Sequence, residues 1–332
     1  MDPLSGLLDH PRARGAFTLR VVMDPPWSID VRDEAALTLV VVLKGSAQLR
    51  ADGRTTGLRR GDVALVRGTE PYVVEHLETV PVGSQVTAAV IGPGQTCSTP
   101  SGVDLHLTLD HGTRTWGNAD DDTEGTDSLL VATYAGTGEV GRLVTDALPR
   151  VAHVPAARED ESTEAAAPGQ GAPLVDLLAH EVTSDGLGQG TVLDRLVDAL
   201  LITTVRAWLT ANPREAPGWL STTRDPVVDA ALRALHGRPA QAWTVASLAH
   251  EVSVSRATLA ARFRTQVGSP PMAYLTQWRL TLAADLLTTT DRTLASIASD
   301  VGYGGPFALS AAFSQQMGAS PSVYRRRYRE SA

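Results

Sequence analysis

Residues 243–275, WTVASLAHEVSVSRATLAARFRTQVGSPPMAYL, have a close counterpart in residues 293–326, TLASIASDVGYGGPFALSAAFSQQMGASPSVYRR, and this repeat decides the fold of the C-terminal third. The first halves align at an offset of 49 residues, where Leu248 and Ala249 match Ile297 and Ala298. Beyond Gly304–Gly305 the offset is 50, because the second copy has one more residue there. The matches at this offset include Leu259 with Leu309, Phe263 with Phe313 and Gly268 with Gly318. One supersecondary unit is therefore used twice.

The spacing within each copy predicts a helix-turn-helix unit. In the first copy we expect helices over 245–251 and 255–267, with Ser255 as the N-cap of the second helix. In the second copy we expect helices over 294–300 and 306–317, with Gly302 in the turn and Pro306 in a first helical turn. A helix over 271–288 connects the units and is roughly 25 Å long at 1.5 Å per residue. Two recognition helices held this far apart can reach successive major grooves of DNA.

The charge is unevenly distributed along the chain of 332 residues, whose formal net charge is −8. Residues 221–332 contain 12 arginines and no lysine against 7 acidic residues, a net charge of +5. The remainder contains 17 basic and 30 acidic residues, a net charge of −13. This asymmetry predicts an acidic body joined to a basic DNA-binding region.

Residues 225–330 resemble the DNA-binding domain of the AraC family of bacterial transcription regulators, through the two copies above and the connecting stretch GSPPMAYLTQWRLTLAADLL. The resemblance implies that double-stranded DNA is the partner, that RNA polymerase is a further one, and that the second helix of each copy faces the bases. The implied contact residues are Ser255, Arg256, Ala257, Thr258, Ala261, Arg262, Arg264, Pro306, Phe307, Ala308, Ala311, Gln315 and Arg326. Ala257, Ala261, Pro306 and Phe307 depart from the polar or arginine side chains more usual in the family. We therefore expect the bases to be read through thymine methyls, DNA shape and a few arginine contacts.

The first 150 residues alternate apolar and polar residues in short runs between glycine-rich turns, which predicts a β-sandwich or barrel. The predicted strands are 36–43, 47–51, 62–66, 72–75, 85–91, 104–109 and 129–134. The stretches LVVVLKGSAQL and RGDVALVRGTEPY make residues 20–155 look like the cupin sensor domain of one branch of the same family. The expected fold class is thus α+β and multidomain, with a cupin-like β-barrel or sandwich, a helical segment, and an all-α double helix-turn-helix.

The cupin-like region lacks the pattern of a metal enzyme. Cupin metal sites use about three imidazoles and a carboxylate, but Val40 and Val42 occupy the strand before Lys44–Gly45, and Tyr72 stands where a ligand histidine is expected. We therefore expect no catalytic residue, metal or cofactor, and the alternative of a cupin-type enzyme or metal-binding protein with an accessory DNA-binding domain is disfavoured. A small-molecule effector is expected in the β domain, with candidate contacts at Trp27, Tyr72, His106 and Trp116.

The expected domains are 1–155 for the sensor, 156–172 for a polar linker, 173–212 for a helical segment and 225–330 for DNA binding. The helix predicted over 191–210 has a broad apolar stripe, which fits either packing on the β domain or dimerisation. In the second case, Leu196 and Leu200 would lie partly buried in a homodimer contact. The single cysteine, Cys97, is expected to be a buried small hydrophobe, and the absence of long apolar runs indicates a cytoplasmic protein without a membrane segment. Together these patterns predict a ligand-controlled, sequence-specific transcription regulator.

Overall fold

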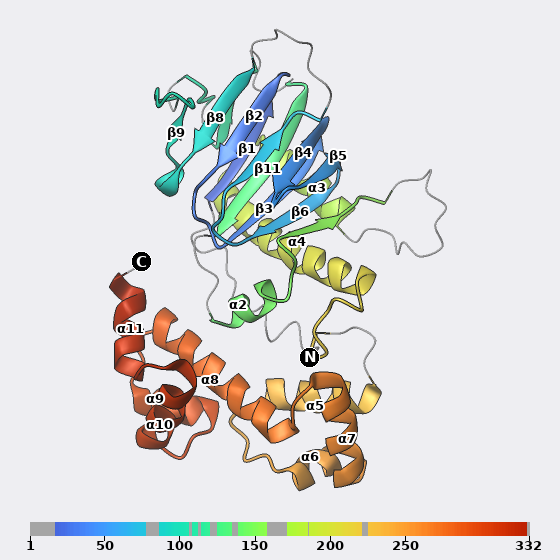
Figure 1. Ribbon diagram of the computed structural model, residues 1–332, viewed down its shortest axis with the longest axis vertical. Helices are drawn as coiled ribbons and strands as arrows, with labels where there is room; N and C mark the ends of the chain where they lie inside the picture. Colours follow the sequence, from blue (N-terminus) through green and yellow to red (C-terminus); the bar gives the residue numbers. More distant parts are fainter. Residues whose placement is uncertain are drawn as a thin grey trace. The chain divides into compact units, whose positions relative to one another are not determined.

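The computed structural model describes residues 17–77, 86–105, 108–111, 114–119, 125–134, 139–157, 171–184, 186–220 and 225–330 (Figure 1). These residues divide into two compact units. One contains the described parts of Arg12–Gly136 and Leu148–Trp208, and the other contains the described parts of Thr137–Ala147 and Leu209–Ala332. In the described residues, no helix combines the length and the apolar composition that a membrane span requires.

The first unit is built on two six-stranded sheets (Figure 1). One sheet has the order β10-β1-β11-β3-β6-β12 and the other the order β5-β4-β7-β2-β8-β9. The strands are β1 (Phe17–Met23), β2 (Trp27–Val31), β3 (Leu37–Lys44), β4 (Ser46–Ala51), β5 (Arg54–Arg59), β6 (Val63–Arg67), β7 (Tyr72–Glu75), β8 (Thr87–Ile91), β9 (Cys97–Ser98), β10 (Thr115–Gly117), β11 (Asp127–Tyr134) and β12 (Val151–Val154).

The unbroken apolar run of β3 has a simple cause. Val40 and Val42 belong to the core between the two sheets, whereas Leu39 and Val41 point to the other face and are also fully buried. Helix α3 (Ala172–Glu181) packs against β3. Because both faces of this strand are covered, it has no polar alternation.

Most of the predicted strands are confirmed, as β3, β4, β6, β7, β8 and β11. The prediction for Asp104–Leu109 is wrong for its described residues: Asp104 forms only an isolated bridge to Ser98, and Thr108 lies in a turn. The neighbouring β9 is only two residues long, so the segment bonds to it locally, with the Leu105 N–H donating to the Cys97 carbonyl at 3.0 Å, and no longer ladder forms. The strands that sequence patterns missed are β1, β2, β5, β9, β10 and β12.

Helix α4 (Gln189–Ala211) follows α3, and most of its apolar stripe is buried against other residues of the same chain. Leu193, Val197 and Leu200 are all fully buried within this single chain. Leu200 therefore has no surface to offer a second subunit, and the expectation of a dimer contact at that residue is wrong. Leu196 is half-buried, and Val192, one turn before it, is 42% exposed. Packing within the chain thus accounts for most of the stripe.

The second unit is helical, and its C-terminal helices are drawn in orange and red in Figure 1. Its helices are α5 (Pro226–Gly237), α6 (Val245–Glu251), α7 (Arg256–Val267), α8 (Pro271–Thr289), α9 (Leu294–Val301), α10 (Pro306–Met317) and α11 (Pro321–Glu330). Sequence patterns predicted all of these except α5 and α11. Helix α2 (Glu139–Thr145) also belongs to this unit and packs on α8, although in sequence it lies between strands β11 and β12.

Helix α8 serves two hydrophobic cores. Near its start, Leu275 packs with α5, α6 and α7 in the core of the first helix-turn-helix unit. Towards its end, Leu280, Ala283, Ala284 and Leu287 pack with α9, α10 and α11 in the core of the second unit. Each helix-turn-helix unit therefore has its own core, and one continuous helix holds the two cores at a fixed spacing.

Candidate nucleic-acid interface and ligand cavity

The first helix-turn-helix unit is set by local hydrogen bonds that its sequence supplies. Thr244 and Ser247 form a reciprocal capping box at the start of α6. Ser253 then turns the chain in the left-handed region, at φ 57°. The predicted cap is confirmed, since the Ser255 hydroxyl accepts a hydrogen bond from the backbone N–H of Thr258 at 3.1 Å.

The second unit repeats this geometry with different residues. The Thr293 hydroxyl accepts from the Ser296 N–H at 3.2 Å, and so caps α9. The turn residue is Gly302 at φ 83°, at the position equivalent to Ser253. Pro306 occupies the first turn of α10, as predicted. Both recognition helices end at a left-handed glycine, Gly268 in one unit and Gly318 in the other.

The inner faces of α7 and α10 are also equivalent. Leu259 and Phe263 are fully buried in the first unit, and Leu309 and Phe313 are fully buried in the second. Each phenylalanine meets a tyrosine edge-on: Phe263 with Tyr274 at 5.8 Å between ring centroids, and Phe313 with Tyr324 at 5.2 Å. These contacts fix which side of each helix remains outside the core.

The outward side of α7 is strongly basic. The predicted contact residues Ser255, Arg256, Ala257, Ala261, Arg262 and Arg264 are all exposed, and Thr258 is half-buried. Arg262 is not a free cation, because its guanidinium donates to the Asp225 carboxylate at 3.0 Å. Arg256 and Arg264 have no ion pair with any described residue. This surface suits phosphate contacts.

The outward side of α10 has no charge at all. Phe307, Ala308, Ala311 and Gln315 are exposed, and Pro306 is half-buried. The ring of Phe307 is 90% exposed. The sequence of the helix, PFALSAAFSQQM, contains no acidic or basic residue. The exposed residues of α10 offer apolar contact and the amides of Gln315 and Gln316.

Two arginines of α11 have different roles. The Arg325 guanidinium donates to the backbone carbonyls of Leu287 at 3.2 Å and Arg292 at 2.6 Å, and so holds the end of α8. Arg326 is exposed, consistent with its availability for a phosphate. Adjacent residues of identical type thus differ in what they touch.

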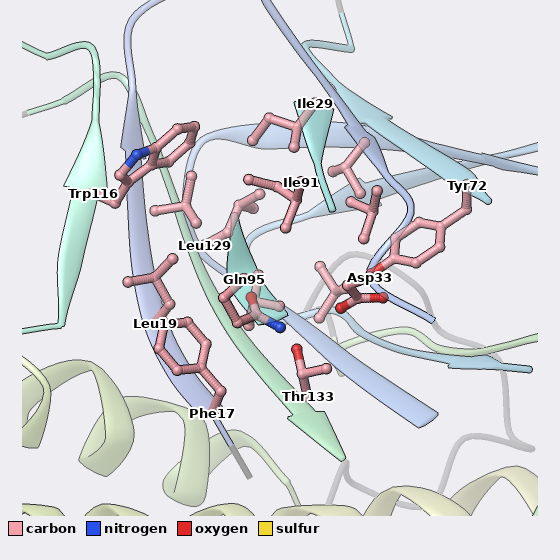
Figure 2. A pocket seen from close by; sticks show the side chains of 15 residues that line it. Phe17, Leu19, Ile29, Asp33, Tyr72, Ile91, Gln95, Trp116, Leu129 and Thr133 are labelled. Atoms are coloured by element: carbon pink, nitrogen blue, oxygen red, sulfur yellow. The ribbon is translucent and has the colours of Figure 1, made fainter. Parts of the chain in front are cut away.

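A cavity lies between the two sheets of the first unit (Figure 2). Its walls are mostly aliphatic and aromatic. The lining residues are Phe17, Leu19, Val21, Ile29, Val31, Asp33, Val40, Tyr72, Val74, Ile91, Gln95, Trp116, Leu129, Val131 and Thr133. Apolar walls with a few polar groups are usual for small-molecule sites.

The polar groups of the cavity belong to one end of the sandwich. Phe17 and Thr133 are paired where β1 begins and β11 finishes, and Val31 and Ile91 are paired where β2 and β8 finish. Asp33 and Gln95 follow these last two strands in sequence, and Figure 2 shows them on the same side of the cavity as Thr133. The cavity is therefore apolar along its walls and polar at that end.

Two of the four predicted ligand contacts, Tyr72 and Trp116, line the cavity. Burial raises the pKa of the Tyr72 phenol, which is hydrogen-bonded to Thr38. Trp27 is not among the lining residues: its ring is buried and its indole N–H donates to the Asp127 carboxylate at 2.8 Å. His106 lies outside the described residues.

The Asp127 carboxylate is a structural hub. It accepts from Trp27, from His76 Nδ1 at 2.8 Å and from the backbone N–H of Ser46 at 3.0 Å.

The cavity residues that sequence patterns missed include Phe17, Asp33, Gln95 and Thr133. Inward-facing alternation along β1 and β11 is the signal that could have found the first and last of them.

The cavity does not have the donors for a cupin metal. Val40, Tyr72 and Val74 line it where imidazoles would be needed. In the described part of the chain, no three histidine, cysteine or acidic side chains converge on one point. The residues present do not fit a metal ion.

Cys97 is buried, as expected for a small hydrophobe. Burial, with a contribution from Asp104, raises the pKa of its thiol to about 11. At neutral pH the sulfur is thus protonated and a poor nucleophile.

Comparison with known families separates the chain into the same two parts. The family described as cupin matches residues 2–210, and the family described as a helix-turn-helix domain matches residues 248–327.

Relatives match along the whole length. A chain of Streptomyces lividans named as an AraC-like transcription regulator is 32% identical over 329 residues, which are 98% of this chain and 98% of that one. The HTH-type transcriptional regulator AlkR of Acinetobacter baylyi is 26% identical, over 98% of this chain and 99% of that one. A solved DNA-binding domain, that of the global transcriptional factor AdpA in complex with a target DNA, is 36% identical. That match covers 32% of this chain and 95% of the AdpA domain, with a TM-score of 0.30.

Proposed function

This chain belongs to the AraC-like family of DNA-binding transcription regulators, with a cupin domain ahead of its helix-turn-helix domain, and we propose that a small apolar molecule in the cupin cavity controls its action on DNA. In this proposal residues 1–155 hold the ligand and residues 225–330 bind an operator in the cytoplasm. The observation that supports DNA recognition most directly is the pair α7 and α10, two recognition helices with equivalent buried faces and equivalent terminal glycines.

Operator recognition is tested with the full-length protein and a library of random DNA duplexes. We expect repeated selection to enrich one sequence with two blocks about one helical turn apart, one block for each recognition helix. If no sequence is enriched over the starting library at low salt, specific DNA recognition by this chain is refuted.

The ligand class follows from the cavity. Aliphatic walls favour a molecule with an apolar body, and the polar end at Asp33, Gln95 and Thr133 favours one hydrogen-bonding head group. The Asp33 carboxylate would repel an anionic head, so the ligand is neutral or cationic. Control requires that the ligand favour one state of the regulator over another.

Chain connectivity supports such control. Thr133 of β11 lines the cavity, and the next helix in sequence, α2, packs on α8 within the helical unit. Val144 of α2 is fully buried. A ligand that shifts the end of β11 thereby acts on a segment that contacts the helix between the two cores.

Ligand binding is tested by thermal unfolding in the presence of a panel of small apolar alcohols, amines and amides. We expect members of the panel to raise the melting temperature of the natural protein and not that of Val131→Phe, which fills the cavity with a larger side chain. The matched control is Val103→Phe, at a residue that is 61% exposed and outside the cavity. Equal ligand response in both variants would place the ligand elsewhere.

The proposal extends to a homodimer and, at promoters, to contact with RNA polymerase. Val192 and Leu196 remain available on the outer side of α4. The double variant Val192→Glu, Leu196→Glu should sediment as a monomer, whereas Ala211→Glu, at the far end of α4, should not change the mass. A double variant of unchanged mass would show that the dimer contact lies away from α4.

Contact with RNA polymerase is tested by transcription from the selected operator with purified components.

A further inference from the structure

Phe307 is exposed to an unusual degree for its residue type. Two of the four phenylalanines, Phe263 and Phe313, are fully buried, and Phe17 is 42% exposed at the cavity. Phe307 is 90% exposed at the start of α10. Leaving an aromatic ring in water is unfavourable, so this position calls for an explanation other than the stability of the domain.

The fold gives no reason for an aromatic ring here. The core of the second helix-turn-helix unit is already filled by Leu309 and Phe313 from the same helix. The equivalent residue of the first unit is Ala257, which is also exposed, so the motif folds with a methyl group at this position. The ring of Phe307 is therefore a feature of the exposed surface that the core of the domain does not require.

The surroundings of the ring are apolar and neutral. Ala308 and Ala311 are exposed beside it, and α10 has no charged side chain with which to approach a phosphate. The first turn of a recognition helix is the part that contacts base edges. In the major groove the thymine C5-methyl is the apolar group that a base edge presents, and phenylalanine and alanine side chains suit it.

We propose that Phe307 is a specificity-determining residue that recognises thymine methyl groups in the block of the operator read by α10. This inference rests on the proposed function, since it requires sequence-specific DNA binding by this chain. Phe307 has no hydrogen-bonding group, so it selects thymine over cytosine by two effects. Cytosine lacks the methyl group, and its N4 amino donor would be covered without an acceptor.

The test uses the duplex enriched by selection with the full-length protein. Each thymine is replaced singly by deoxyuridine, which removes the C5-methyl and leaves base pairing intact. In the natural protein we expect one or two replacements in the α10 block to weaken binding about fourfold each, the effect of losing one buried methyl-sized group. In Phe307→Ala the same replacements should change the Kd by less than about 1.5-fold.

Two controls separate this role from a structural one. The melting temperature of Phe307→Ala should equal that of the natural protein, because the ring is not part of the core. Gln316→Ala, at an exposed residue of the same helix that is not among the predicted DNA contacts, should keep the sensitivity to deoxyuridine.

The proposal is overturned if the natural protein tolerates every deoxyuridine in that block, or if Phe307→Ala retains the same sensitivity. It is also overturned if Phe307→Ala binds DNA normally but loses transcription with purified polymerase, which would make the ring a protein contact. Failure of selection to enrich any sequence would refute the proposed function itself, whereas an enriched operator with no methyl effect would refute this inference alone.

Discussion

The exposed side of α7 carries three arginines, and the exposed side of α10, at the same place in the second helix-turn-helix unit, carries none. At the shared offset of 50 residues, Arg256, Arg262 and Arg264 are replaced by Pro306, Ala312 and Ser314. The buried leucine and phenylalanine and the terminal glycine are equivalent in both, whereas the Ser255 side chain caps α7 and Gly305 precedes α10 without a side-chain cap. The repeat therefore fixes a backbone and a core, while the chemistry offered to DNA is set separately in each copy.

The two units also differ at their turns. Gly302 and Ser253 are both left-handed, but a methyl group at Gly302 would lie 2.7 Å from the Cα of Ala240. Only the second turn therefore needs glycine for space as well as for conformation.

Gly302→Ala should lower the free energy of unfolding by roughly 2–4 kcal/mol, since the new methyl meets backbone atoms and the left-handed conformation disfavours alanine. Urea unfolding followed by tryptophan fluorescence measures this loss. Gly304→Ala is the control, because nothing lies within 4 Å of its new methyl. Similar losses in both variants would contradict a special role for Gly302.

Arg256→Ala combined with Arg264→Ala should weaken DNA binding by about tenfold or more and reduce the slope of log K against log salt by about 2, as expected for two lost phosphate contacts. Binding titrations at several salt concentrations measure the slope. Ser314→Ala in the second unit should leave the slope unchanged, and Ser314→Arg should raise it by about 1. An unchanged slope in the double variant would show that α7 does not contact phosphates through these arginines.

Ser253→Gly should raise the free energy of unfolding by roughly 0.5 kcal/mol. The steric penalty that serine has in the left-handed region is slightly larger than the conformational entropy that glycine loses on folding. The same urea experiment resolves this change when both variants are measured together. A loss of stability would mean that the serine hydroxyl, rather than the backbone, governs this turn.

Asp225→Asn should increase DNA affinity by about twofold, because it frees Arg262 from its ion pair and removes one negative charge beside the DNA-contacting surface. Asparagine keeps the N-cap of α5, where the Asp225 side chain accepts from the Val227 N–H at 2.8 Å. Arg262→Ala in the same background should abolish the gain. A gain that persists without Arg262 would assign the effect to the charge alone.

The local parts of the fold were predictable because their signals are local. Helix caps, turn glycines and the buried Leu and Phe of each repeat act within a few residues, and Ser255, Pro306 and Gly302 were each assigned their correct place. The missed strand β5 has one buried residue, Leu58, and therefore a weak apolar signal. The missed strand β12 has four residues and is held by its pairing with β6, far away in sequence.

Sequence patterns were sufficient to predict a cupin-like domain followed by two helix-turn-helix units, because strand alternation between glycine-rich turns and a repeat with its own caps and core are both local signals. Tertiary structure alone decided how individual side chains are used. The indole of Trp27 donates to Asp127 and does not line the cavity, and Leu200 is buried in the core. Arg262 forms an ion pair with Asp225, and the ring of Phe307 is exposed to solvent. The physical reason is that burial and ion pairing depend on partners distant in sequence, which periodicity within one segment does not specify.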